Sequence, residues 1–381
     1  MKFIDLFAGI GGFHLAIKKT DHKAKCVFAS EFNKSSADVY FENFGIPAFN
    51  DITLVEERNI PRFDLLTAGF PCQPFSKGGK QAGFDDIGRG TLFFEIIRIL
   101  RFHKPKYILL ENVSNIISHD EGNTYRVILK ELKNLGYFIP DKPLVLSPTD
   151  LNIPVKRPRV FIVGRLNKPF TTDFIVPIKN SELDVMNYFD FNIESEENTN
   201  LTDYELRLLT MWNEFMNGVT VKTIGFPIWY NSLTDKPFDT SQYEWRNNFN
   251  QKNQELYLKN RKFIDKWKKK HKNAEWVKNN AHLNFEWQVG TAYSSIYEGL
   301  IQFRTSGIRV SKRSSFNTLV AMGHTQILGP LKRRLNLDEL KQLQGFTTEF
   351  KLGLSNSDSI KQLGNSVHVG VVVNVLKYLL R

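Results

Sequence analysis

Cysteine is nearly absent from this chain, which has only Cys26 and Cys72 among its 381 residues. Two cysteines exclude a disulfide framework and a cysteine-rich zinc site. We therefore expect no bound metal. So few thiols also fit a reducing compartment, and we expect a cytoplasmic protein encoded by a bacterium or a phage.

Long hydrophobic runs are also missing. No stretch approaches the roughly 18 uninterrupted apolar residues typical of a membrane-spanning helix, so we expect no membrane partner. The apolar N-terminus lacks a basic leading segment and is interrupted by Asp5. It is therefore predicted to form a core strand and turn rather than a signal peptide.

Acidic residues are outnumbered, with 40 Asp and Glu against 51 Lys and Arg, which gives a net charge of +11. A hydrophobic content of 41% and a charged content of 24% are ordinary for a globular protein. The excess positive charge suggests a polyanionic partner, although many basic proteins bind no nucleic acid. Charge alone therefore does not decide whether this chain binds nucleic acid.

Apolar runs alternate with helical patterns in the first part of the chain, as a parallel α/β sheet requires. The predicted strands are 2–7, 26–30, 63–68, 107–111 and 161–164. The predicted helices are 90–101, 123–135, 337–344 and 367–380. Between about 167 and 303 the chain is rich in Asn, Lys, Trp and Phe, and shows little alternation of strands and helices.

One segment of this middle region, 257–280, is densely basic and contains Trp267 and Trp276. It is compatible with a helix whose positive face meets phosphates, and equally with a solvated helix. The two tryptophans fit a core or scaffold role at least as well as a contact with DNA.

The first chemical motif is DLFAGIGG, residues 5–12, in which a strand ends in closely spaced glycines and leads into a helix. Such a turn lets a ligand approach the backbone closely. Glu31 follows the next strand, 19 residues after Gly12, where an acid can accept hydrogen bonds from ribose hydroxyls. The pattern is not GxGxxG, which favours a nucleoside cofactor over a dinucleotide. The alternative is merely tight packing of strand on helix.

The second motif, GFPCQPFS, directly follows the strand 63–68 and contains Cys72. A lone cysteine is often a small buried hydrophobe, but prolines at 71 and 74 stiffen this loop. An ordinary thiol with a pKa of about 8.5 is only a few per cent thiolate at neutral pH. A nucleophilic role therefore requires local donors or positive charge.

Further charged residues stand at other strand ends. Glu111 follows four apolar residues, so we expect burial to raise its pKa and let it donate a proton. Arg157 and Arg159, at i and i+2 on an extended segment, are predicted to face one side and to suit a phosphate or a base carbonyl. Each alone is compatible with a structural acid or a surface pair, and it is their joint occurrence that favours a site.

Together these motifs resemble the bacterial C5-cytosine-specific DNA methyltransferases of type II restriction-modification systems. The matching segments, in the order of that family, are DLFAGIGG, SEF, NDI, GFPCQPFS, RGTLFFEI, ENV, RPRVFIVG, LQGF and QLGNSV. They cover nearly all of 1–167 and 330–381, and PCQ followed by ENV is highly specific.

The resemblance implies an α/β, Rossmann-like methyltransferase fold with a mostly parallel sheet and a second, smaller target-recognition domain. Residues 1–167 would form the first part of the catalytic and cofactor-binding domain, and 168–330 the target-recognition domain. Residues 331–381 would complete the cofactor pocket.

The resemblance also implies a mechanism in which the target cytosine is flipped out of duplex DNA. Cys72 would add to carbon 6, which activates carbon 5 for methylation by S-adenosylmethionine. Glu111 would assist at ring nitrogen 3, and Arg159, with Arg157 secondarily, would lie near the cytosine carbonyl.

The cofactor and DNA contacts follow by matching the motifs. The implied S-adenosylmethionine site comprises Phe7, Gly9, Ile10, Gly11, Gly12, Glu31, Phe32, Asp51, Ile52, Pro71, Leu92, Asn365 and Ser366. The implied DNA contacts are Ser76, Lys77, Arg89 and Arg313. The stretch 76–90 would close over DNA, or serve as an ordinary surface linker. We expect a monomer acting on double-stranded DNA, and a cognate restriction endonuclease acting on the same site without a stable complex.

The chain departs from the family at Val155, where Gln usually precedes the two arginines. Because both arginines are present, we expect activity to be retained. Two rival functions are a tRNA cytosine methyltransferase and a catalytically inactive DNA-binding regulator. The long basic middle region disfavours the first, and intact motif residues disfavour the second. A dehydrogenase is disfavoured because GxGxxG is missing.

Overall fold

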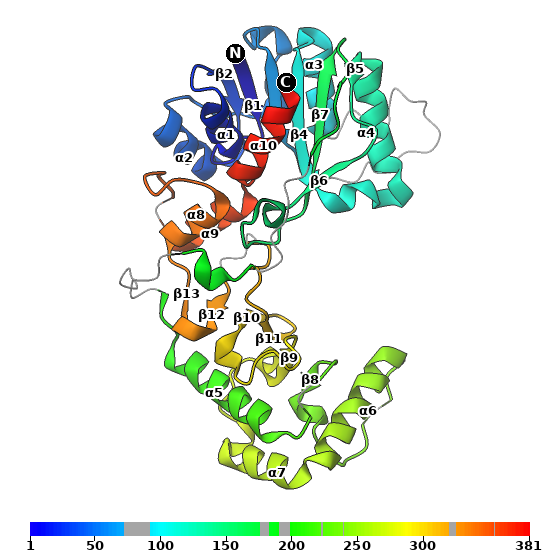
Figure 1. The fold of residues 1–381 in the computed structure, drawn as a ribbon, viewed down its shortest axis with the longest axis vertical. Coiled ribbons are helices and arrows are strands. Elements are labelled where there is room, and N and C mark those ends of the chain that lie inside the picture. The colour runs from blue at the N-terminus through cyan, green and yellow to red at the C-terminus, as the bar shows by residue number, and fades with distance from the viewer. Residues whose placement is uncertain are drawn as a thin grey trace. The chain divides into compact units, whose positions relative to one another are not determined.

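The computed structural model describes residues 1–71, 92–175, 183–189, 199–221, 224–238, 240–319, 325–353 and 355–381. They form two compact units, which are described separately (Figure 1). Unit 1 comprises Met1–Ser181, Asn317–Gly323 and Leu337–Arg381, and unit 2 comprises Glu182–Phe316 and His324–Asn336. The boundaries predicted from the sequence lie at 167 and 330. The functional role of each unit stays a prediction.

Unit 1 is built on a sheet with the strand order β2-β1-β3-β4-β7-β5, and β6 also pairs with β7. Its strands are β1 (Lys2–Leu6), β2 (Lys25–Ser30), β3 (Leu65–Gly69), β4 (Tyr107–Val113), β5 (Tyr137–Phe138), β6 (Leu144–Leu146) and β7 (Arg159–Leu166). Its helices are α1 (Gly12–Thr20), α2 (Lys34–Phe44), α3 (Leu92–His103), α4 (Asn123–Asn134), α8 (Leu337–Gln344), α9 (Asn356–Asn365) and α10 (Val369–Leu379). Strands β1 to β4 run parallel, whereas β7 is antiparallel to β4. The predicted α/β fold is confirmed.

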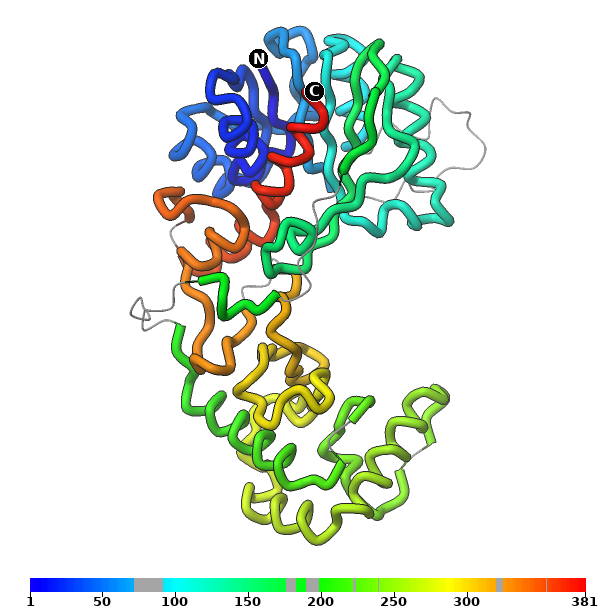
Figure 2. Tube along the Cα trace, viewed as in Figure 1, coloured from blue at the N-terminus to red at the C-terminus, as the bar shows by residue number. Residues whose placement is uncertain are grey.

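Alternating side chains of the strands supply both faces of this sheet, because successive residues of a strand point in opposite directions. Ile4 and Leu6 of β1 belong to a core cluster with side chains of α3 and α4. Phe3 points to the other face of the sheet, where its ring centroid lies 5.0 Å from that of His14 in α1. Helix α10 packs against α1, so the last helix joins the first βα unit although the two are far apart in sequence, as Figure 2 shows.

The strands and helices that the sequence predicted for unit 1 agree with the structure to within a few residues, but helices α2 and α9 were not predicted. The short strands β5 and β6 were not predicted, because two or three residues show no recognisable alternation. They are antiparallel partners of β7 and extend the sheet beyond its parallel part.

Unit 2 contains a second sheet with the strand order β13-β12-β10-β11-β9-β8, which the sequence analysis missed. Its strands are β8 (Ile228–Trp229), β9 (Asn284–Trp287), β10 (Leu300–Arg304), β11 (Gly307–Ser311), β12 (Ile327–Leu328) and β13 (Arg333–Arg334), and its helices are α5 (Asp203–Gly218), α6 (Glu244–Lys259) and α7 (Arg261–Lys270). Its core holds a stacked pair of rings, Trp212 and Phe285, with centroids 4.9 Å apart.

The basic segment 257–280 is not a single helix. It contains the end of α6, then α7, which stops at Lys270, and residues with positive φ at 272–274. Trp267 is buried and donates its indole N–H to the carbonyl of Met211 at 2.9 Å. The contacts of Trp267 fit the scaffold role. Trp276 is half-buried and donates to the carbonyl of His271 at 3.0 Å.

Among the described residues, no helix is long and apolar enough to cross a membrane.

Candidate active site

The predicted site residues of unit 1 gather at one edge of the sheet, where the parallel strands end. The glycine turn follows β1, Glu31 follows β2, and Pro71 lies just beyond β3. Glu111 lies near the end of β4 and pairs in register with Gly69. Arg159 belongs to the same edge because β7 runs the other way and begins there. The carboxyl edge of a parallel sheet is where α/β folds place their ligands.

Buried Glu111 and half-buried Arg159 form an ion pair, with 3.0 Å between the carboxylate Oε1 and the guanidinium Nε. Burial raises the pKa of Glu111 above its ordinary value and outweighs the two arginines, Arg159 and Arg157, which lower it. The predicted burial of this acid is confirmed, and burial acts on its pKa in the predicted direction. A carboxyl group with a raised pKa can remain protonated and donate a hydrogen bond.

Asn112, the next residue of β4, is a structural link that the sequence analysis did not single out. Its side-chain amide donates to the carbonyl of Phe70 at 2.9 Å, and its Oδ1 accepts from the backbone N–H of Val113 at 2.8 Å. The side chain is buried. It thus ties the end of β4 to the residue before Pro71, and its place in the ENV motif was the signal available in the sequence.

Arg157 differs from Arg159 in its contacts. Its buried guanidinium donates to the carbonyls of Leu319 at 3.1 Å, Gly364 at 2.8 Å and Ser366 at 2.8 Å. The expectation that it meets a phosphate or base alongside Arg159 is therefore revised, because its guanidinium is taken up by backbone carbonyls. Arg157 fastens the chain around 364–366 to the strand segment that carries Arg159.

The glycine turn is shaped by backbone conformation. Gly9 has φ +54° and no atom within 4 Å of where a Cβ would lie, so one side of the turn is open. Gly11 and Gly12 instead permit close packing, because a Cβ on Gly12 would lie 2.5 Å from the hydroxyl oxygen of Ser366. Phe7, at φ +53°, is among the non-glycine residues in the left-handed region.

Glu31 is held against this turn. Its Oε2 accepts from the backbone N–H of Gly9 at 2.8 Å and its Oε1 from that of Asn33 at 2.7 Å. The neighbouring ring of Phe32 is 75% exposed, which is unusual for a large apolar side chain. An exposed ring beside a fixed carboxylate can stack on a flat heterocycle.

The remaining predicted cofactor residues lie at the same edge or close to it in sequence. Asp51 caps a short helical turn by accepting from the N–H of Thr53 at 2.9 Å, and Ile52 is buried. Leu92 is the first residue of α3, Asn365 the last of α9, and Ser366 is buried beside the glycine turn. Ile10 is also buried in the turn.

Several predicted residues lie outside the described part of the chain, namely Cys72, Ser76, Lys77 and Arg89. The proposed closing stretch 76–90 lies there as well. Arg313 is described and belongs to unit 2, where its guanidinium pairs with Asp184 at 3.0 Å. Its free capacity to bind a phosphate is reduced by that pair. In the described part of the chain, no group of His, Cys, Asp and Glu residues is arranged to hold a metal ion.

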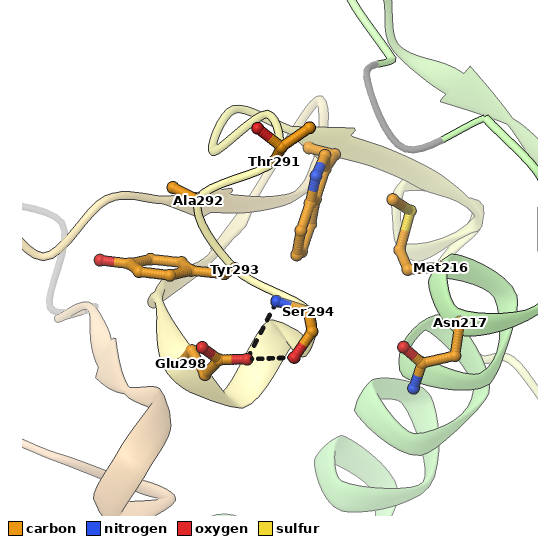
Figure 3. A pocket seen from close by; sticks show the side chains of 8 residues that line it. Met216, Asn217, Thr291, Ala292, Tyr293, Ser294 and Glu298 are labelled. Carbon is orange, nitrogen blue, oxygen red and sulfur yellow. Dashed lines mark hydrogen bonds between the residues drawn. The ribbon is translucent and has the colours of Figure 1, made fainter.

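Unit 2 also contains a cavity of about 390 Å³ (Figure 3). It is lined by Met216, Asn217, Trp287, Thr291, Ala292, Tyr293, Ser294 and Glu298. The carboxylate of Glu298 is hydrogen-bonded to Ser294, accepting from its backbone N–H at 3.0 Å and from its hydroxyl at 2.8 Å. None of the predicted catalytic or cofactor residues lines this cavity.

The fold of unit 1 and the polar edge of its sheet define the class as an S-adenosylmethionine-dependent methyltransferase fold. A sequence profile described as C-5 cytosine-specific DNA methylase matches residues 1–381. The chain therefore belongs to this family and is a DNA (cytosine-5)-methyltransferase of the type II restriction-modification type. Membership in this family implies S-adenosylmethionine as the methyl donor.

Individual relatives agree over nearly the whole chain. Type II methyltransferase M.HhaI from Haemophilus parahaemolyticus is 32% identical over 379 residues, covering 100% of this chain and 93% of its own. Type II methyltransferase M.HgiCI from Herpetosiphon aurantiacus is 32% identical over 420 residues, covering 99% and 97%. The crystal structure of the S. pombe Dnmt2 methyltransferase shares the fold, with a TM-score of 0.54, 19% identity and coverage of 100% and 98%.

Proposed function

We propose that the enzyme flips a target cytosine out of duplex DNA and methylates its carbon 5 through a covalent intermediate with Cys72. The observation that carries this proposal is the pairing of buried Glu111 with Arg159 at the carboxyl edge of the sheet. A carboxyl group that burial keeps protonated can donate a hydrogen bond to a ring nitrogen, and the guanidinium beside it can donate to a ring carbonyl. The target carbon is inaccessible in a stacked duplex, which is why flipping is required.

In the covalent step, the thiolate of Cys72 forms a bond to carbon 6 of the cytosine, and the ring electrons shift toward carbon 5 and nitrogen 3. Protonated Glu111 donates a hydrogen bond to nitrogen 3, where negative charge develops. Arg159 orients Glu111 and donates to the ring carbonyl. After transfer, the proton leaves carbon 5, the sulfur–carbon bond breaks and the thiolate is regenerated. No described residue is assigned as the base for that proton.

The residues around the glycine turn fit S-adenosylmethionine, which supplies an electrophilic methyl group when bound. Glu31 uses each carboxylate oxygen for one backbone N–H, and an ionised carboxylate offers about four acceptor sites in all. It therefore keeps capacity for two ribose hydroxyls. The open side of Gly9 leaves room for a close approach, and Phe32 offers a face for the adenine.

We assign the other predicted cofactor residues to the walls of this site. They are Phe7, Ile10, Gly11, Gly12, Asp51, Ile52, Pro71, Leu92, Asn365 and Ser366. Arg157 is a positioning residue in this proposal, because its contacts are with backbone carbonyls beside Asn365 and Ser366 rather than with a ligand.

The proposed partner is double-stranded DNA, contacted by Ser76, Lys77, Arg89 and Arg313 and recognised by the region 168–330. We also propose that the enzyme acts as a monomer and shares its site with a cognate endonuclease. The positive net charge of the chain supports a polyanionic substrate.

A covalent trap tests the mechanism. Random-sequence duplex DNA in which 5-fluorocytosine replaces cytosine is incubated with enzyme and S-adenosylmethionine, then resolved on a denaturing gel. Fluorine cannot leave as a proton does, so the proposed adduct persists and shifts the protein band. Wild type should form the adduct and Cys72→Ser should not. An equal shift in both proteins, or none from a wild type that methylates ordinary DNA, overturns the proposal.

A further inference from the structure

The positive charge of this protein is concentrated in one short segment. Residues 259–272 contain eight lysines and arginines and one acid, Asp265, and so carry a net charge of +7 of the +11 of the whole chain. The segment covers the end of α6 and all of α7 in unit 2. Such a concentration creates a local positive field that an even distribution does not.

Helix α7 is anchored to unit 2 by one face only. Ile264 and Trp267, which are i and i+3, are buried in the core, and Trp267 is also hydrogen-bonded to Met211. Residues three and four apart lie on one face of a helix. The opposite face of α7 therefore points to solvent and carries Lys262, Lys266 and Lys269, all exposed. We call these three residues the basic stripe.

Most other cations of the segment already have partners. Arg261 pairs with Asp235 at 2.7 Å, and Lys270 pairs with Glu214 at 2.6 Å. Lys268 donates to the carbonyl of Leu233 at 2.7 Å. In the described part of the chain, the three lysines of the basic stripe have no acidic or hydrogen-bonding partner.

Unpaired like charges on one rigid face repel each other, and a partner of opposite charge relieves that repulsion. The spacing is regular, since i, i+4 and i+7 correspond to about 10 Å along a helix. A row of phosphates complements such a row of ammonium groups, because duplex DNA carries one negative charge per about 1.7 Å of its axis. The ammonium of lysine suits a phosphate as a point charge.

We infer that the basic stripe binds the phosphate backbone of duplex DNA and supplies part of the enzyme's sequence-independent affinity. This inference rests on DNA as the substrate, and it assigns a phosphate-contact role to one helix face within the region 168–330, separate from the residues assigned to catalysis and cofactor binding. The stripe reads no bases, because phosphate contacts carry no sequence information directly.

The test is the salt dependence of binding to duplex DNA of arbitrary sequence, measured by fluorescence anisotropy without S-adenosylmethionine. The stripe variant Lys262→Gln/Lys266→Gln/Lys269→Gln is compared with wild type. The slope of log affinity against log salt should become shallower by about 2.7, since each neutralised phosphate contributes about 0.9. Replacing the same three lysines by arginine should retain the wild-type slope.

A matched control replaces three exposed lysines of unit 1, Lys23, Lys25 and Lys106, by glutamine. They lie at the amino-terminal edge of its sheet, the edge away from the proposed catalytic residues. This control should keep the wild-type slope. An unchanged slope in the stripe variant, or an equal change in the control, overturns the inference. Methyl transfer is measured separately on the same proteins, so a failure of the proposed mechanism is distinguishable from a failure of the stripe.

Discussion

Glu111 and Asp5 are both buried acids of unit 1, yet their surroundings differ. Glu111 has Arg159 at ion-pair distance, whereas the carboxyl of Asp5 accepts from the hydroxyl of Thr67 at 2.9 Å. Burial raises the pKa of both groups, and that of Asp5 to about 8. Glu111 lies at the carboxyl edge of the sheet, so its substitution is expected to affect catalysis. Asp5 lies within β1, before the glycine turn, so its substitution is expected to affect stability.

Glu111→Gln should lower the turnover number about 10²- to 10⁴-fold, the range that a positioned acid or base contributes. Glutamine has nearly the same shape but cannot release or carry the proton at nitrogen 3. For wild type, the rate should fall as pH rises through the raised pKa of Glu111, because the protonated form is the active one. Single-turnover methylation across pH measures both effects. A variant with the wild-type rate and pH profile excludes this role.

Asp5→Asn should change how stability depends on pH. The folded-state pKa of Asp5 is about 8 against an ordinary value of 3.8, so between these values the folded protein holds a proton that the unfolded chain has lost. Its contribution to stability therefore decreases as pH rises from about 4 to about 8, by at most about 1.4 kcal/mol per pH unit. Denaturant unfolding at several pH values should show a shallower decline for Asp5→Asn. Parallel curves for the two proteins contradict the burial argument.

At the scale of elements, the carboxyl edge of the sheet is held together by a turn and by hydrogen bonds between residues far apart in sequence. The glycine turn joins β1 to α1, and Arg157 joins the start of β7 to the end of α9. The pattern of apolar runs predicted β1, β4 and α10, because each is long and strongly apolar. It did not predict the contacts of Arg157, because its partners Gly364 and Ser366 are more than 200 residues distant and only the fold brings them near.

Gly9→Ala and Gly45→Ala form a matched pair. Both glycines have positive φ, +54° and +67°, and both have open space where the new Cβ would lie. Each substitution should cost about 1–2 kcal/mol of stability for left-handed backbone. Only Gly9→Ala should also weaken S-adenosylmethionine binding, which calorimetry measures. Equal cofactor affinity in the two variants argues against a cofactor over Gly9.

Arg157→Lys should weaken cofactor binding and lower stability. A single ammonium nitrogen cannot occupy the positions of both Nη1 and Nη2, so at least one of the three carbonyls loses its donor. Each buried, unpaired group costs about 1–3 kcal/mol. Arg165→Lys is the control, since Arg165 is a buried arginine of β7, the strand that follows Arg157, and donates to the carbonyls of Tyr378 and Leu379. It should lower stability to a similar degree and leave cofactor affinity unchanged. Thermal unfolding and calorimetry on both variants separate a positioning role from a structural one.

At the scale of the whole molecule, sequence motifs predicted unit 1 far better than unit 2. Apart from β5 and β6, the strands and helices of unit 1 are long enough to show their period, and its predicted site residues stand at strand ends. Unit 2 is held by strands of two to five residues and by aromatic packing such as Trp212 on Phe285, which leave no regular pattern. Composition and charge marked the region as different, but only its tertiary contacts define its sheet.

Bisulfite sequencing tests the proposed activity most directly. The chain is expressed in a host that lacks DNA methylation, beside a Cys72→Ser control, and host DNA is sequenced after bisulfite treatment. Methylated cytosines in one short sequence context, absent from the control, are the predicted result. They would identify the target site and the nucleophile together. No methylated cytosine from folded, cofactor-binding wild-type protein, or the same pattern from Cys72→Ser, would contradict cytosine methylation of DNA through Cys72.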